Sequence, residues 1–172
     1  MQNKETKIYR SSSNRAHWWD YSNNGTYFIT ICTKDRINYF GRVQQGEIIL
    51  NPLGQSVLKC WNSIPIFHPY VVLDAFIIMP NHVHGILHID NGESKSISLP
   101  KECKTPSGSL GSIIRGFKVG VKKEAYILNI PFFWQSRYHD HIIRTADSYQ
   151  KIANYIVMNP LTWEQDKFYN NL

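Results

Sequence analysis

Two histidines near the middle of the chain carry the clearest chemical signal. His82 and His84 are separated by one residue in an apolar stretch that is predicted to form a strand. Residues two apart in a strand project from the same face, so the imidazoles lie together, roughly 6.6 Å apart along the strand, with Val83 facing the core. Such a pair can bind one metal ion; the alternative is a half-buried strand that happens to carry two histidines. His88 shares the face but lies about 13 Å beyond His84, too far to join them.

A second group of interest lies near the C-terminus. Tyr155 and Asn159 are four residues apart on a helix predicted over about 146–159, so they share a helical face. An apolar stripe beside them must pack on the sheet, which brings the tyrosine hydroxyl and the asparagine oxygen toward the histidines. A metal held by two imidazoles needs further ligands, usually oxygen. The alternative is a core tyrosine and an asparagine that ends the helix before Pro160.

The elements that must position these residues follow one another in a regular order. Apolar and turn patterns predict strands over 27–32, 71–79, 82–89 and 137–143, and helices over 52–64, 110–121 and 146–159. Without its final helix, this order is the βαββαβ pattern of a ferredoxin-like fold, an antiparallel sheet with helices packed on it. We therefore predict an α+β protein in which an extra C-terminal helix carries the tyrosine.

Length and composition indicate one compact domain over residues 1–172. The chain is 42% hydrophobic and 19% charged, which excludes a disordered chain or a coiled coil. We expect an N-terminal arm over 1–25 and a mobile loop over 91–108, where Ser, Lys, Gly and Pro are frequent. No run is long enough to cross a bilayer and the N-terminus lacks a signal-like apolar region, so we expect a cytoplasmic protein.

The charge favours an anionic partner. Nineteen Lys and Arg against 13 Asp and Glu give a formal net charge of +6. Nucleic acid is a frequent partner of a basic domain of this size, and a merely soluble surface is the alternative.

Taken together, these motifs resemble the HUH single-tyrosine transposases, and most closely their REP-associated tyrosine transposase (RAYT) branch. The resemblance covers roughly residues 25–166. The residues that carry it are Gly25–Thr30, Met79-Pro80-Asn81-His82-Val83-His84, Trp134-Gln135-x-Arg137-Tyr138-x-Asp140-His141-Ile142-Ile143-Arg144, Tyr155-Ile156-x-x-Asn159-Pro160 and Trp163-Glu164-x-Asp166.

The resemblance implies a metal-dependent endonuclease and strand transferase that acts on single-stranded DNA at hairpin-associated sites such as REP elements. His82, His84 and Asn159 would hold a divalent ion, Mg²⁺ or Mn²⁺. Tyr155 would attack the scissile phosphate to form a 5′-phosphotyrosine, and a second 3′-hydroxyl would reverse the step to join strands. Because a free tyrosine has a pKa near 10, it needs the metal or a base, and the sequence identifies no base.

The resemblance also suggests roles for basic residues. Cations form a stripe along the helix predicted over 110–121 and at the residue that follows it. This stripe is either a solvated face of the helix or a surface that contacts the DNA backbone, and we favour the contact. Two arginines that flank the strand over 137–143 are further candidates, either for phosphate binding or for an ion-pair network. The candidate DNA-binding residues are Arg115, Lys118, Lys122, Arg137 and Arg144.

Three residues near the last strand each have two interpretations. Asp140 either orients a metal-bound histidine or belongs to an ion-pair network. His141 either orients a metal-bound histidine or is a core residue. Trp134 either stacks on a base or is buried under the last helix, and we favour burial.

Two other classes of function remain open from the sequence. One is a non-catalytic nucleic-acid-binding module on a ferredoxin-like scaffold, which leaves the histidine pair without a role. The other is a metal-dependent hydrolase of a small molecule, which needs an acidic base that the strand over 82–89 does not contain. The expected partner is single-stranded or hairpin DNA and not a membrane, and we expect a monomer while a homodimer stays open.

Overall fold

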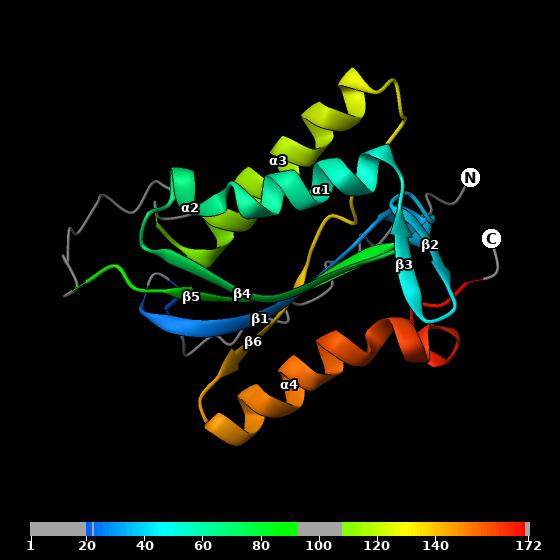
Figure 1. The fold of residues 1–172 in the computed structure, drawn as a ribbon. Coiled ribbons are helices and arrows are strands. Elements are labelled where there is room, and N and C mark those ends of the chain that lie inside the picture. Colours follow the sequence, from blue (N-terminus) through cyan, green and yellow to red (C-terminus); the bar gives the residue numbers. More distant parts are fainter. Residues whose placement is uncertain (1–19, 22, 93–107, 171–172) are drawn as a thin grey trace, which may run out of the picture.

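A four-stranded antiparallel sheet forms the centre of the protein. The structure is a computed structural model, which describes residues 20–21, 23–92 and 108–170 (Figure 1). The strands lie in the order β4-β5-β1-β6. Counted along the chain, this order is 2-3-1-4, as in a ferredoxin-like sheet. The bounds are Gly25–Cys32 for β1, Val71–Met79 for β4, His82–Ile89 for β5 and His139–Ile143 for β6.

The predicted α+β fold is confirmed. Most of the predicted arm (1–19 and 22) and loop (93–107) lies outside the described residues.

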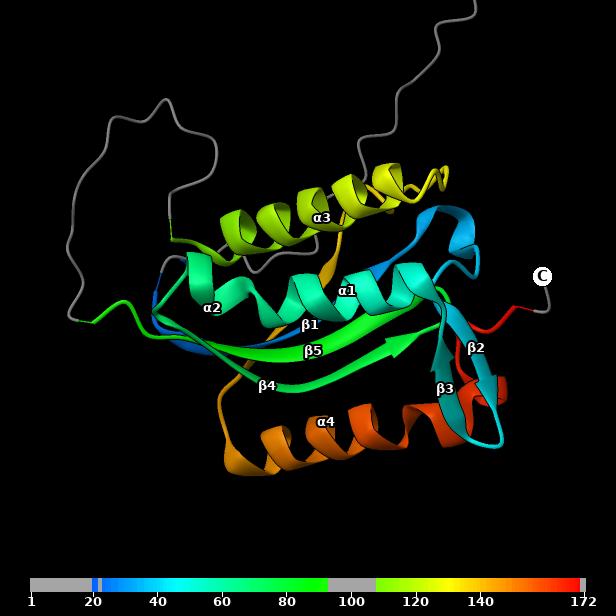
Figure 2. The same ribbon diagram turned by 45° about the horizontal axis from the view of Figure 1, so that its top comes forward.

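Helices cover both faces of this sheet. Helices α1 (Pro52–Asn62) and α3 (Leu110–Ile127) lie on one face, and α4 (Ala146–Met158) lies on the other (Figures 1 and 2). After α4 the chain continues as a 3₁₀ turn, η2 (Asn159–Gln165), in which Pro160 occupies the first turn. No helix in the described part of the chain is long and apolar enough to cross a membrane.

A hairpin lies near one end of the sheet and a short second helix near the other (Figures 1 and 2). The hairpin consists of β2 (Gly41–Gln44) and β3 (Glu47–Leu50), and Asn51 then caps α1 by accepting a hydrogen bond from the Gly54 amide at 2.9 Å. The prediction that this helix continues to Ile64 was wrong. Helix α1 ends at Asn62, and Pro65 lies in the first turn of a short helix, α2 (Ile64–Phe67), where its missing N–H leaves no hydrogen bond unmade.

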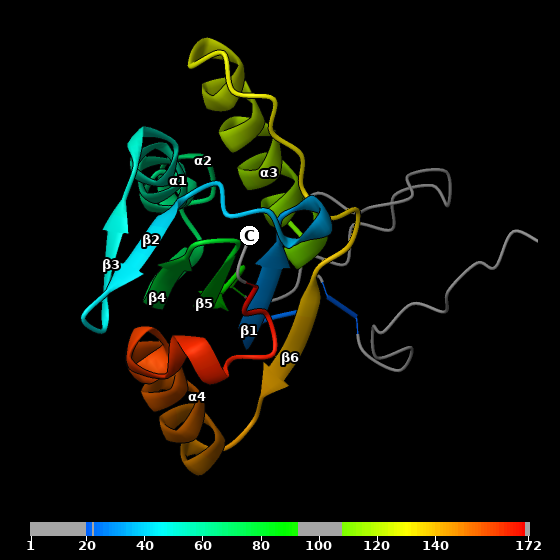
Figure 3. The ribbon, with the colours of Figure 1, turned by 90° about the vertical axis from the view of Figure 1, so that its right-hand side faces the viewer.

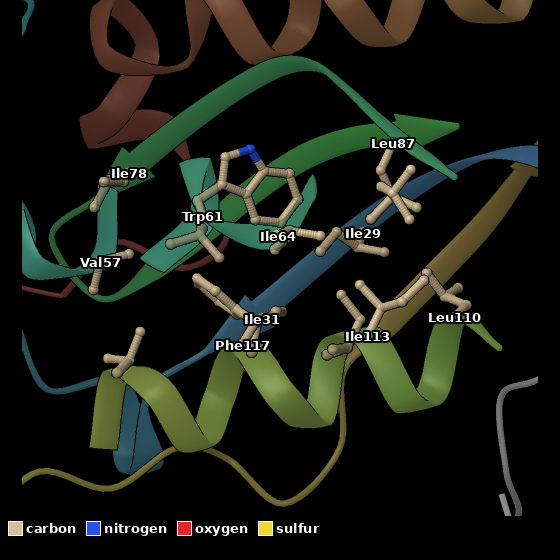
Figure 4. Close-up of a cluster of buried hydrophobic side chains, with 14 of the residues drawn as sticks. Ile29, Ile31, Val57, Trp61, Ile64, Ile78, Leu87, Leu110, Ile113 and Phe117 are labelled. Carbon is tan, nitrogen blue, oxygen red and sulfur yellow. The ribbon is translucent and has the colours of Figure 1, made fainter. Parts of the chain in front are cut away.

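The main hydrophobic core lies between the sheet and the pair α1 and α3 (Figure 4). Trp61 stacks on Phe76 with the ring centroids 4.2 Å apart and the planes nearly parallel. Both rings depend on Gly85, because a Cβ atom there would lie 2.7 Å from the indole. Val83, two residues earlier on β5, is fully buried in the same core. Strand alternation then places His82 and His84 on the opposite face, toward α4.

Candidate metal and tyrosine site

The two histidines of β5 converge at their ring nitrogens. The Nε2 atoms of His82 and His84 are 3.1 Å apart, and both residues are almost completely buried. Two nitrogen ligands at right angles around an ion, each about 2.1 Å from it, are about 3.0 Å apart. The separation therefore fits adjacent ligand positions on one octahedral ion.

Hydrogen bonds fix the orientation of His82. The Asn81 side-chain nitrogen donates to the backbone oxygens of Arg36 and Phe168, at 3.1 and 2.8 Å. Its Oδ1 atom must then be the atom that faces His82 Nδ1 at 2.8 Å, so Nδ1 carries the proton. His82 Nε2 is left with a free lone pair directed at the centre of the site. This is how metal-binding histidines are usually oriented by a second layer of contacts.

His84 has a matching contact on its other side. The hydroxyl of Thr30, on the neighbouring strand β1, lies 2.8 Å from His84 Nδ1. A hydroxyl oxygen can accept a hydrogen bond from a protonated Nδ1 and thereby leave Nε2 free to bind a metal. Burial lowers the pKa of His84 to about 4 and the pKa of His82 well below its usual value. Both imidazoles are therefore neutral at physiological pH, which is the form that binds metal.

The tyrosine predicted as nucleophile lies beside this pair. Tyr155 projects from α4, and its hydroxyl is 3.1 Å from His84 Nε2. It also donates to Asp166 Oδ2 at 3.3 Å. The side chain is 40% exposed, so the hydroxyl lies at a surface that a substrate can approach. Burial and the nearby Asp166 carboxylate raise the pKa of Tyr155 to about 12, so the hydroxyl keeps its proton at neutral pH.

Two side-chain oxygens, from Asn159 and Asp166, are candidates for further metal ligands. Asn159, at the end of α4, is fully buried, and its Oδ1 atom has no hydrogen-bond partner. Its Nδ2 atom donates to Asp166 Oδ2 at 3.0 Å. Ligand atoms of His82, His84 and Asp166 all lie within 4.8 Å of one another, close enough to share one ion. An unpaired buried oxygen and this donor set both fit a divalent cation.

Asp166 is the residue that the sequence did not identify as part of the site. It follows the 3₁₀ turn η2, and helical spacing from Tyr155 does not extend through that turn. The motif Trp163-Glu164-x-Asp166 was a signal that an acidic residue follows the tyrosine helix. Asn81, next to His82 in the tight turn between β4 and β5, likewise belongs to a motif that carries the resemblance, but the sequence suggested no role for it.

The residues of β6 divide between the two faces of the sheet. Asp140 pairs with Ile29, whose side chain is in the main core, so Asp140 points away from the histidine pair. The placement of Asp140 around the metal site is therefore corrected. His141 pairs with Phe28 on the α4 side, where it lines a hollow with residues of α4. His139 is on that same side, because it pairs with Thr30, which in turn pairs with His84, and the sequence analysis did not single it out.

The predicted DNA-binding residues lie apart from the tyrosine. Arg115, Lys118 and Lys122 are on α3, which covers the opposite face of the sheet. Arg137 and Arg144 flank β6 at exposed positions.

The predicted burial of Trp134 under the last helix was wrong. Its ring packs in the core on the α3 side, with its Nε1 atom donating to the Lys118 backbone oxygen at 3.2 Å. Sequence spacing cannot assign a loop residue such as Trp134 to a face.

Comparison with known proteins shows which sequences and folds this chain is similar to. No family model matches the sequence. A REP-associated tyrosine transposase of Escherichia coli is 23% identical over 141 residues, which are 82% of this chain and 69% of that protein. The structure of a REP-associated tyrosine transposase bound to a REP hairpin has the same fold, with a TM-score of 0.60 and 20% identity, over 91% of this chain and 77% of the other. The chain is thus similar to the REP-associated tyrosine transposases, as its motifs predicted.

One relative matches almost from end to end. An uncharacterized protein of Haemophilus influenzae is 40% identical over 173 residues, which are 94% of each chain. The present protein belongs to the same family as that protein, within a group similar to the tyrosine transposases.

Proposed function

We propose that this protein cuts and rejoins single-stranded DNA at hairpin-associated sites, by a metal-dependent reaction that passes through a 5′-phosphotyrosine. The observation that carries the proposal is the 3.1 Å separation between the Tyr155 hydroxyl and His84 Nε2. A nucleophile and a metal-binding pair from distant parts of the chain meet on one face of the sheet. The DNA-binding transposases with which the chain shares its fold support the choice of DNA as substrate.

Neutral imidazoles and buried oxygens form the proposed metal site. His82 and His84 each direct Nε2 toward the centre, and Asp166 supplies a carboxylate oxygen. Asn159, which the family resemblance assigns as the third protein ligand, offers its unpaired Oδ1 atom. Mg²⁺ or Mn²⁺ suits such a mixed set of ligands, and it would supply charge that neutralises the scissile phosphate.

Asn159 and Asp166 compete for the third protein position. Asp166 Oδ2 already accepts hydrogen bonds from the Tyr155 hydroxyl and from Asn159 Nδ2. If this oxygen bound the metal ion, both donors would lose their hydrogen-bond acceptor. Metal binding to the variants Asn159→Ala and Asp166→Asn separates these alternatives. The larger loss of affinity identifies the third ligand.

In the proposed reaction Tyr155 Oη attacks phosphorus and the bond from phosphorus to the 3′-oxygen breaks. The 5′-phosphate stays on the tyrosine, and the 3′-oxygen takes a proton and leaves as a hydroxyl. Asp166 Oδ2, within hydrogen-bond distance of the hydroxyl, is placed to accept the tyrosine proton when it is not bound to metal. Because the covalent bond conserves the energy of the broken one, attack by another 3′-hydroxyl restores a DNA strand.

The test is formation of a covalent adduct. Wild-type protein is incubated with a single-stranded hairpin oligonucleotide and Mn²⁺ or Mg²⁺, then denatured and resolved on a gel. We expect an adduct that is absent with EDTA and absent in Tyr155→Phe. The matched control is Tyr149→Phe, on the same helix, whose hydroxyl donates to Asp74 and not to the histidines.

Two results would overturn the proposal. An adduct that persists in Tyr155→Phe rejects the nucleophile, and cleavage that persists in the double variant His82→Ala, His84→Ala rejects the metal site. A protein that retains DNA in EDTA and never forms an adduct is a binding module.

A further inference from the structure

A groove on the far side of the sheet has features that the tyrosine site does not explain. It lies between α3 and the segment 133–138 that leads into β6, which run side by side (Figure 3). Its volume is about 410 Å³. Three of its lining residues are the basic side chains Arg115, Lys118 and Lys122, and none of the described residues that line it is acidic.

The groove combines positive charge with exposed apolar surface. Phe133 is 52% exposed and Val119 is 64% exposed, both unusually open for such side chains. The ammonium groups of Lys122 and Lys34 lie 5.7 and 5.8 Å from the centre of the Phe133 ring. Both ammonium groups lie over this half-exposed ring, so a base that stacks on Phe133 takes the place of one of them, and the displaced lysine can then contact an adjoining phosphate.

Lys118 differs from the other two cations. Its Nζ atom donates to the Gln135 backbone oxygen at 2.6 Å, and its own backbone oxygen accepts from Trp134. It therefore ties the two walls of the groove together. Arg115 and Lys122 are the exposed cations that remain for a ligand.

Neighbouring residues connect the groove to the histidines. Trp134, Gln135 and Ser136 also line a second hollow, together with Lys34, Asp35 and Arg36. The Arg36 guanidinium lies 5.1 Å from the centre of the Phe168 ring. The Phe168 ring centre is 4.6 Å from that of His82. A single DNA strand that follows these residues would pass around the end of β1, from one face of the sheet to the other.

We propose that this groove holds a single-stranded segment of the DNA that flanks the scissile phosphate, with a base stacked on Phe133 and phosphates beside Arg115 and Lys122. This inference rests on the proposed function. A duplex is a poorer occupant, because its bases are stacked on one another and offer Phe133 no open face. The charge of the lining matches a polyanion.

The test is equilibrium binding of the full chain to a short fluorescent oligothymidine in EDTA, followed by anisotropy. We expect Phe133→Ala to weaken binding roughly tenfold or more, the usual effect of removing one stacked base. Tyr126→Ala is the aromatic control, because Tyr126 is 80% exposed on α3 and does not line the groove. An oligonucleotide with abasic sites should bind wild type and Phe133→Ala equally, since no base remains to stack.

Charge is tested by a matched pair of neighbours. Lys122→Gln should reduce the slope of log affinity against log salt by about 0.7, the value for one phosphate contact to a single strand. Lys123→Gln removes the same charge one residue along the helix, outside the groove, and should leave the slope unchanged. Circular dichroism verifies that each variant is folded.

Separate readouts distinguish the groove from the chemistry. Unchanged affinity in Phe133→Ala, an equal loss on the abasic probe, or equally tight binding of duplex would overturn the groove. Covalent adduct formation by the same wild-type sample is scored independently. If Phe133→Ala does not change the affinity while wild type forms the adduct, only the groove is rejected. If Phe133→Ala weakens binding as expected while wild type forms no adduct, the proposed reaction is rejected.

Discussion

The two faces of the sheet are built from the same strands but differ in what they bury. The face under α1 and α3 carries a large apolar cluster that includes Ile29, Ile31 and Val83. The face under α4 has a small apolar cluster of Ile86, Ile143 and Ile156, followed by buried polar residues. Along β5 the two sets alternate residue by residue. The large core fixes the strand so firmly that its other face can keep two buried imidazoles in close contact.

The largest effect should come from the core side. Trp61→Ala removes a fully buried indole from the centre of the main cluster, and we expect a loss of about 3–5 kcal/mol in the free energy of unfolding. Urea denaturation measures it. A loss below about 1 kcal/mol would show that the core on this face is not the main source of stability.

Acid should weaken the protein through the α4 side. The pKa of His84 is about 4 in the fold against 6.5 for a free side chain, because burial disfavours its charged form. The unfolded chain then binds more protons, so stability is full above pH 6.5 and is lost as pH falls toward 4. The shift corresponds to about 3 kcal/mol. Urea midpoints from pH 7 to pH 4 should fall more steeply in wild type than in His84→Gln, and equal slopes would contradict this account.

Asn81 should affect metal binding more than stability of the core. Asn81→Ala frees His82 to rotate and to change tautomer, and we expect metal affinity to fall about 10- to 100-fold. Calorimetric titration with Mn²⁺ gives the affinity. Asn62→Ala, at an exposed position at the end of α1 on the other face of the sheet, serves as a distant asparagine control. Equal affinity in wild type and Asn81→Ala would show that the hydrogen bond to His82 does not orient the ligand.

The smallest change in stability is expected for Tyr155, the proposed nucleophile. Tyr155→Phe removes one hydroxyl at a 40% exposed position, and we expect at most about 1 kcal/mol of lost stability. Thermal unfolding of the variant checks it. A loss as large as that of Trp61→Ala would mean that Tyr155 is a core residue, and its effect on activity would then be indirect.

Periodic features of the sequence predicted most of the fold. Alternation located β4 and β5 at their observed bounds, and it placed Val83 inward and the two histidines outward. Helical spacing placed Tyr155 and Asn159 on one face, which the structure brings to His84 and Asp166. These predictions succeeded because the periods of strands and helices determine which side chains share a face.

Contacts that depend on irregular backbone were not predictable in the same way. Asp166 reaches the site through a 3₁₀ turn, and Trp134 lies in a loop, so neither has a periodic neighbour that assigns its face. Asp140 was misplaced because the position of the edge strand β6 relative to β1 sets which residues face α4. That register is a tertiary property.

The most direct test of the central claim is to locate the covalent bond itself. Wild-type protein is reacted with hairpin DNA and Mn²⁺, digested with protease and nuclease, and analysed by tandem mass spectrometry. We predict a nucleotide remnant joined through its 5′-phosphate to Tyr155. A remnant on Tyr149, on any other residue, or joined through a 3′-phosphate would contradict the assignment of Tyr155 and the histidine pair as one reaction centre.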